Sequence, residues 1–138
     1  MIRTGETLMK IDHIGYAVKR IDRAQKAFID LGYTFEPIVD DTDRNIRISF
    51  GERDGYRIEL VCPLDKGIES PVDAYLSKIG ATPYHICYQT ECMERDIENL
   101  KSNGYRVITE PAKAIAFNNK RVVFLFSLAT GLIELVEI

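Results

Sequence analysis

An internal repeat constrains the fold of this chain more than any other feature of its sequence. The segment His13–Tyr16 returns as His85–Tyr88 with three of its four residues identical. After a three-residue insertion, Ile58–Val61 returns as Ile133–Val136 with all four residues identical. Smaller matches keep the same order along the chain: Arg23 with Arg95, and Gly32-Tyr33 with Gly104-Tyr105. The chain is therefore predicted to consist of two copies of one structural unit.

Each copy shows the same order of predicted elements. Ile11–Val18 alternates and carries Tyr and Val, which predicts a strand. Apolar residues at helical spacing then predict a helix over 21–31, which Gly32 ends. The second copy repeats this pattern with Met93, Ile97 and Leu100 ahead of Gly104. Three further strands are predicted in each copy, over Tyr33–Val39, Ile46–Phe50 and Tyr56–Val61, and over Tyr105–Ile108, Arg121–Phe126 and Leu132–Val136. Each copy is thus a βαβββ module.

The length of 138 residues suits one domain. We expect a single domain over 1–138, with module one at about 10–62, a linker at about 63–82 and module two at about 83–138. In the linker, Ser70 is predicted to cap a short helix whose first residue is Pro71 and which Gly80 ends.

Composition excludes several classes of protein. The chain is 46% hydrophobic and 28% charged, as in an ordinary globular protein. The net charge of −3 and the lack of a basic stripe argue against nucleic acid as a partner. No run approaches the roughly 20 apolar residues that cross a bilayer. The first nine residues are too short and too polar for a secretory signal. We therefore expect a cytoplasmic protein with no membrane partner.

The three cysteines Cys62, Cys87 and Cys92 are odd in number and match no zinc-knuckle spacing. Disulfides and thiolate zinc sites are therefore not expected, and reduced thiols suit the cytosol. Cys87 lies in an apolar alternating segment and is predicted to be a small core residue.

Four polar residues occupy equivalent places in the two modules. The two histidines, His13 and His85, lie on the first strand of each module, and Glu59 and Glu134 lie on the last. We call these four residues the His/Glu cluster. Each glutamate points to the opposite face of its strand from its Ile and Leu neighbours. Because a buried carboxylate must be paired or bound to a metal, facing modules would bring the four groups together around an ion.

Two imidazoles and two carboxylates suit Ni²⁺, Co²⁺ or Zn²⁺, and also Mn²⁺ or Fe²⁺, rather than a structural zinc. Four protein ligands on an octahedral ion leave two positions open, as in a catalytic site. Considered singly, each histidine could be a hydrogen-bonded core residue instead of a metal ligand. Each glutamate could likewise be a solvent-facing residue at a sheet edge. The repetition of all four favours one divalent ion.

Several segments resemble the vicinal-oxygen-chelate superfamily, which includes glyoxalases, bleomycin-resistance proteins and dioxygenases. They are Asp12–Val18, the helix at Ser70-Pro71, Pro83–Ile86 and Gly131–Glu137. The resemblance runs from about Lys10 to Ile138. It implies an α+β fold in which two tandem βαβββ modules form a curved mixed sheet around a central metal site.

Two branches of that superfamily are similar to this chain. Thr82–Tyr88, with Val123–Ser127 and Gly131–Glu134, is similar to compact bacterial glyoxalase I (lactoylglutathione lyase). His13–Val18 and the helix after Ser70 are similar to methylmalonyl-CoA epimerases. The chain departs from both branches. Ala17 stands where many glyoxalases I carry an arginine, and Phe126–Leu128 stands where epimerases carry His-Pro-Lys.

The resemblance implies one mechanism for both branches. The metal polarises a substrate carbonyl, and Glu134 is the base that moves a proton on the adjacent carbon. We expect apolar surroundings to raise the pKa of Glu134 toward a useful range. In an epimerase, Asp43 or Glu59 would deliver the proton to the opposite face. Candidates for holding an anionic substrate tail are Arg44, Arg47, Lys120 and Arg121, and Phe117–Asn119 is a candidate lid.

We expect a metal-dependent lyase or isomerase of the glyoxalase I type, acting on the hemithioacetal of a thiol with methylglyoxal. The alternatives are a methylmalonyl-CoA (acyl-CoA) epimerase and a non-catalytic drug-binding protein on the same fold. A homodimer is expected, with the metal site completed either within one chain or across the interface.

Overall fold

The computed structural model describes residues 9–138, and the opening segment considered above as a secretory signal lies largely outside them. The first half of the chain contains β1 (Ile11–Ala17), α1 (Ile21–Asp30), β2 (Thr34–Phe35), β3 (Val39–Asp41), β4 (Ile46–Arg53) and β5 (Tyr56–Pro63). A short helix, α2 (Asp73–Lys78), follows. The second half contains β6 (Thr82–Thr90), α3 (Met93–Ser102), β7 (Arg106–Val107), β8 (Ala112–Ala114), the 3-10 turn η1 (Ile115–Phe117), β9 (Lys120–Ser127) and β10 (Gly131–Glu137).

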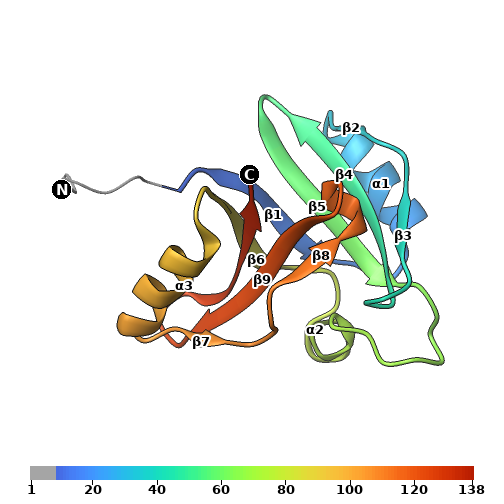
Figure 1. Cartoon of the computed structure of the whole chain (residues 1–138). Helices are drawn as coiled ribbons and strands as arrows, with labels where there is room; N and C mark the ends of the chain where they lie inside the picture. Colours follow the sequence, from blue (N-terminus) through green and yellow to red (C-terminus); the bar gives the residue numbers. More distant parts are fainter. Residues whose placement is uncertain (1–8) are drawn as a thin grey trace.

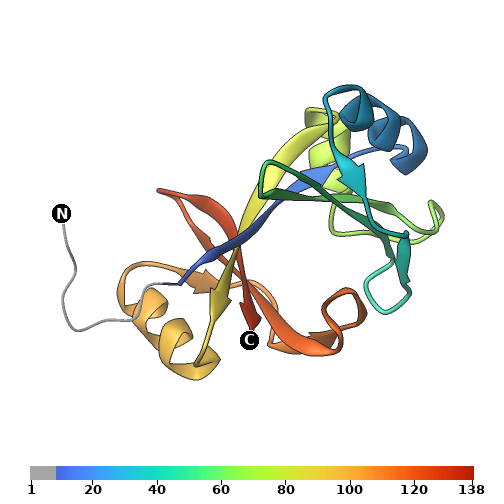
Figure 2. The ribbon, with the colours of Figure 1, turned by 90° about the horizontal axis from the view of Figure 1, so that it is seen from above.

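The strands form one sheet in the order β2-β4-β5-β1-β6-β10-β9-β7, with β3 beside β4 and β8 beside β9. In the first half β1 runs parallel to β5, and in the second half β6 runs parallel to β10. The two halves join where β1 pairs antiparallel with β6. Figures 1 and 2 show that the sheet is strongly curved, so that both halves bend toward the same side of the central strands. The predicted α+β fold with a curved mixed sheet is confirmed.

The two longer helices cover the outer face of the sheet, one in each half (Figure 2). Residues of α1 pack on Ile58 and Leu60 of β5. Residues of α3 pack on Ile133 and Leu135 of β10. Because side chains alternate along a strand, Glu59 and Glu134 point to the inner, concave face.

Three local predictions differ from the structure. The expected strand over 33–39 is two short strands, β2 and β3, and Pro37 lies between them, where proline supplies no N–H for a ladder. The strand β8 was not predicted, since three residues of Ala-Lys-Ala carry no strand pattern. Helix α2 begins at Asp73 rather than at Pro71, and the predicted cap by the Ser70 side chain is replaced by a contact in the opposite direction. The Ser70 N–H donates to the Asp73 carboxylate at 2.8 Å, while no Ser70 side-chain cap forms.

No helix within residues 9–138 is long and apolar enough to span a membrane.

Candidate metal centre

The four central strands bring the His/Glu cluster together. Strands β5, β1, β6 and β10 lie side by side and contribute one member each. The register places both Glu59 and His85 opposite Gly15, and both His13 and Glu134 opposite Cys87. Gly15 and Cys87 are both small residues, which leaves space for the four converging side chains. At Gly15 a Cβ atom would lie 2.1 Å from Cε1 of His85, so only glycine leaves room for that ring.

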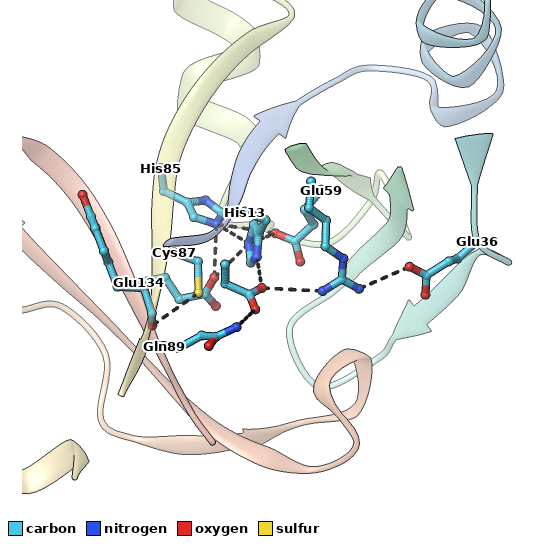
Figure 3. A network of polar contacts seen from close by, with 10 residues as sticks. His13, Glu36, Glu59, His85, Cys87, Gln89 and Glu134 are labelled. Carbon is cyan, nitrogen blue, oxygen red and sulfur yellow. Dashed lines mark hydrogen bonds and ion pairs between the residues drawn. The ribbon is translucent and has the colours of Figure 1, made fainter. Parts of the chain in front are cut away.

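The four polar ends converge on one point (Figure 3). Nε2 of His13 lies 3.2 Å from Nε2 of His85 and 3.3 Å from Oε1 of Glu59. Oε1 of Glu134 lies 3.1 Å from Nε2 of His85 and 3.4 Å from Nε2 of His13. One ligand atom from each residue falls within 4.8 Å of the others, and no residue of the cluster is more than 4% exposed.

The chemistry of these donors fits a divalent cation. Within residues 9–138, Oε1 of Glu134 and Nδ1 of His85 are buried without any hydrogen-bond partner. An unsatisfied buried carboxylate oxygen is costly unless a cation meets it. Two carboxylates balance the charge of a divalent ion, and nitrogen and oxygen donors suit the first-row metals named above. The cluster can therefore hold one divalent ion.

The protein groups of the cluster shift one another's protonation. Burial lowers the pKa of His13, but the charge of Glu59 and several hydrogen bonds, the one with Asp12 foremost, raise it well above its ordinary value. Burial raises the pKa of Glu134, but the close approach and the charges of the His13 and His85 imidazoles outweigh burial and lower it to about 2. The prediction of a raised Glu134 pKa is therefore wrong for the protein groups taken by themselves, because two imidazoles lie in contact with that carboxylate.

Aromatic rings surround the two imidazoles. Phe117 stacks on His13 with ring centroids 5.6 Å apart, and Phe50 meets the same ring edge-on. Tyr84 and Phe124 meet His85 edge-on, with centroids 4.5 Å and 5.3 Å away. Phe117, in the candidate lid, thus covers the His13 side of the cluster.

A cavity of about 650 Å³ adjoins the cluster on its His85 side. Tyr84 and Phe124, which contact His85, form part of its wall, together with the apolar side chains of Phe126 and Leu132. Its charged lining residues are Asp43, Arg44, Arg106, Glu110 and Lys113. A cavity of this size and polarity is typical of a small-molecule site.

The remaining predicted site residues divide into two groups. Asp43 is exposed in the turn between β3 and β4 and lines the cavity, but it is not part of the His/Glu cluster. Arg44 also lines the cavity, and it joins the two halves by donating to the Lys113 carbonyl at 3.1 Å.

The second group of predicted site residues does not line the cavity: Arg47, Lys120 and Arg121. Arg47 pairs with Asp40, and Arg121 pairs with Glu94 and Glu137.

Sequence reasoning missed two cavity cations, Arg106 and Lys113. Both lie on strands of two or three residues, where no periodicity marks the facing of a side chain. It also missed Asp12, whose carboxylate contacts His13. The only signal for Asp12 was its place directly before the histidine. Tyr16, next to the cluster in the sequence, packs against Phe28 of α1.

Known proteins match the chain over nearly its whole length. The uncharacterized protein YqjC of Bacillus subtilis is 28% identical over 133 residues, which cover 93% of this chain and 91% of that protein. The mitochondrial methylmalonyl-CoA epimerase of Bos taurus is 27% identical over 120 residues, covering 86% of this chain and 67% of that protein. The crystal structure of methylmalonyl-CoA epimerase from Mycobacterium tuberculosis superposes with a TM-score of 0.82 at 28% identity, covering 99% of this chain and 92% of that one.

Residues 12–124 match the sequence pattern of a large family, and that range includes three members of the His/Glu cluster. The fourth, Glu134, lies beyond the matched range, but the repeat and the sheet register place it with the others. The fold, the matched range and the paired modules agree. The chain belongs to the glyoxalase/bleomycin resistance protein/dioxygenase superfamily.

Proposed function

We propose that this protein is a metal-dependent epimerase that moves a proton on the carbon next to the carbonyl of an acyl-CoA thioester. One observation carries the proposal. The buried His/Glu cluster adjoins an apolar cavity of about 650 Å³ that has cations among its lining residues. The similarity to methylmalonyl-CoA epimerases in both sequence and fold supports this substrate class over the hemithioacetal that the sequence patterns favoured.

The residues divide the chemistry among them. His13, Glu59, His85 and Glu134 would hold the ion, which supplies a Lewis acid for the substrate carbonyl. Glu134 is the proposed base, because its Oε1 is buried, has no hydrogen-bond partner within residues 9–138, and lies 3.1 Å from Nε2 of His85, whose ring contacts the cavity wall at Phe124.

An epimerase needs a second group that returns the proton to the opposite face of the carbon. Asp43 is the proposed group, since it lines the same cavity from the other half of the chain. Glu59 is the alternative, because it lies within the cluster itself. We infer that Arg44, Arg106 and Lys113 meet the anionic part of a CoA substrate by charge, since all three line the cavity.

Exchange of the substrate proton with solvent tests the reaction directly. Metal-free protein is loaded with Ni²⁺, Co²⁺ or Zn²⁺ and incubated with methylmalonyl-CoA in D₂O, and deuterium uptake at the α-carbon is followed by mass spectrometry. We expect metal-dependent uptake that falls at least about 100-fold in Glu134→Gln. Arg47→Gln, which removes a surface cation outside the cavity, serves as the matched control and should exchange normally.

The same preparations are assayed with the hemithioacetal of methylglyoxal and glutathione. Turnover of that adduct without exchange in any acyl-CoA would move the protein to the glyoxalase I branch. Tight binding of small apolar ligands without turnover of either substrate would indicate a binding protein and overturn the proposal.

A further inference from the structure

We propose that Asp12 is the positioning residue of the metal centre, and that it holds His13 as a fixed ligand while His85 has no such support. The proposal rests on the metal site proposed above. Oδ2 of Asp12 lies 2.7 Å from Nδ1 of His13. Nδ1 therefore carries the proton and donates it, which leaves the lone pair of Nε2 facing the other three members of the cluster.

Asp12 is itself held on both oxygens. Gln89 donates from Nε2 to Oδ1 of Asp12 at 2.9 Å, and a guanidinium nitrogen of Arg57 lies 3.6 Å from Oδ2. Arg57 lies over the Phe50 ring at 4.0 Å and pairs at its other end with Glu36. Figure 3 shows this chain of contacts running from His13 to Glu36, whose side chain is exposed. The Asp12 side chain is only 12% exposed, so water competes little for its oxygens.

A register shift in the sheet accounts for the contact between the neighbouring side chains of Asp12 and His13. Neighbouring side chains on a regular strand point to opposite faces. The pairing of β1 with β6 shifts register between Ile11 and His13. Such a shift re-aims side chains, and here Asp12 reaches the concave face together with its neighbour.

The repeat does not reproduce this support in the second module. The residues equivalent to Asp12, Arg57 and Gln89 are Tyr84, Leu132 and Ala17. Correspondingly, Nδ1 of His85 has no hydrogen-bond partner within residues 9–138. Tyr84 and Leu132 instead form part of the cavity wall. The metal centre thus has polar support at His13 and apolar surroundings at His85, whose ring contacts the cavity-wall residues Tyr84 and Phe124.

Metal affinity of the unloaded protein tests this assignment without any assay of turnover. Co²⁺ binding is measured by calorimetry and by the visible absorption of the bound ion for wild type, Asp12→Ala, Asp12→Asn and Gln89→Ala. We expect Asp12→Ala to lose about 10- to 100-fold in Co²⁺ affinity and to change the visible spectrum. Asp12→Asn keeps an acceptor for Nδ1–H and should recover part of the affinity, while Gln89→Ala should show a smaller loss.

Glu36→Gln is the matched control, because it removes a carboxylate from the outer end of the same chain of contacts. It should leave affinity and spectrum unchanged. His13→Ala identifies the site. If wild type fails to bind Co²⁺, or if His13→Ala binds it equally well, the proposed metal site is wrong. If His13→Ala abolishes binding but both Asp12 variants bind as wild type does, only the role of Asp12 is overturned.

Discussion

At the scale of single residues, the centre depends on how its groups share protons. Two imidazole Nε2 atoms lie 3.2 Å apart and each lies near two carboxylate oxygens. Binding a metal requires both imidazoles to be neutral at those nitrogens. The contacts that raise the pKa of His13 therefore place protons in competition with the ion.

This competition predicts the pH dependence of metal binding. Because the pKa of His13 lies well above 6.5, an ion must displace a proton from it below that raised pKa. We expect Co²⁺ affinity to keep rising between pH 6.5 and 8, by up to about tenfold per unit. Calorimetry in two buffers of different ionisation enthalpy should detect the released proton. Affinity that levels off by pH 6.5, as for an ordinary histidine, would contradict the prediction.

At the scale of elements, the antiparallel pairing of β1 with β6 decides whether the four side chains of the His/Glu cluster can meet. Gly15 lies opposite both His85 and Glu59, and its missing side chain leaves the space that the imidazole occupies. The position requires glycine for close approach rather than for backbone conformation.

We expect Gly15→Ala to displace the ring of His85, because the new Cβ would lie 2.1 Å from Cε1. Overpacking of this kind costs about 1–3 kcal/mol of stability. Co²⁺ affinity should fall by at least about tenfold, and urea unfolding should give the loss of stability. Gly67→Ala is the control, since its new Cβ would meet only the end of the Asp65 side chain, and both measurements should stay near wild type. Unchanged metal binding in Gly15→Ala would argue against His85 as a ligand.

At the scale of the whole molecule, the cluster joins the two halves of the chain. Each half contributes one histidine and one glutamate, and all four come from one chain. An ion bound there would cross-link the two halves next to the pairing of β1 with β6. The homodimer and the division into modules remain predictions.

A bound ion should therefore stabilise the native protein. An ion present at 100 times its Kd adds about 2.7 kcal/mol to the free energy of unfolding and raises Tm by several degrees. Differential scanning calorimetry with Ni²⁺, Co²⁺ or Zn²⁺, and again after chelation, measures the effect. The variant Glu59→Gln should lose most of the shift. A Tm that rises equally in wild type and in this variant would show that the ions act elsewhere.

The sequence by itself predicted the curved α+β fold from its repeated pattern, and it singled out the four residues of the His/Glu cluster that the structure brings together. Both follow from local regularities, because alternation, helical spacing and repetition are properties of neighbouring or equivalent residues. Only the tertiary structure decided which strand edges meet and that the cluster forms within one chain. It also selected Arg106 and Lys113 over Arg47 and Arg121 as cavity cations, and it reversed the expected shift of the Glu134 pKa. These outcomes depend on contacts between residues far apart in sequence, such as the 3.1 Å approach of His85 to Glu134, which no local pattern encodes.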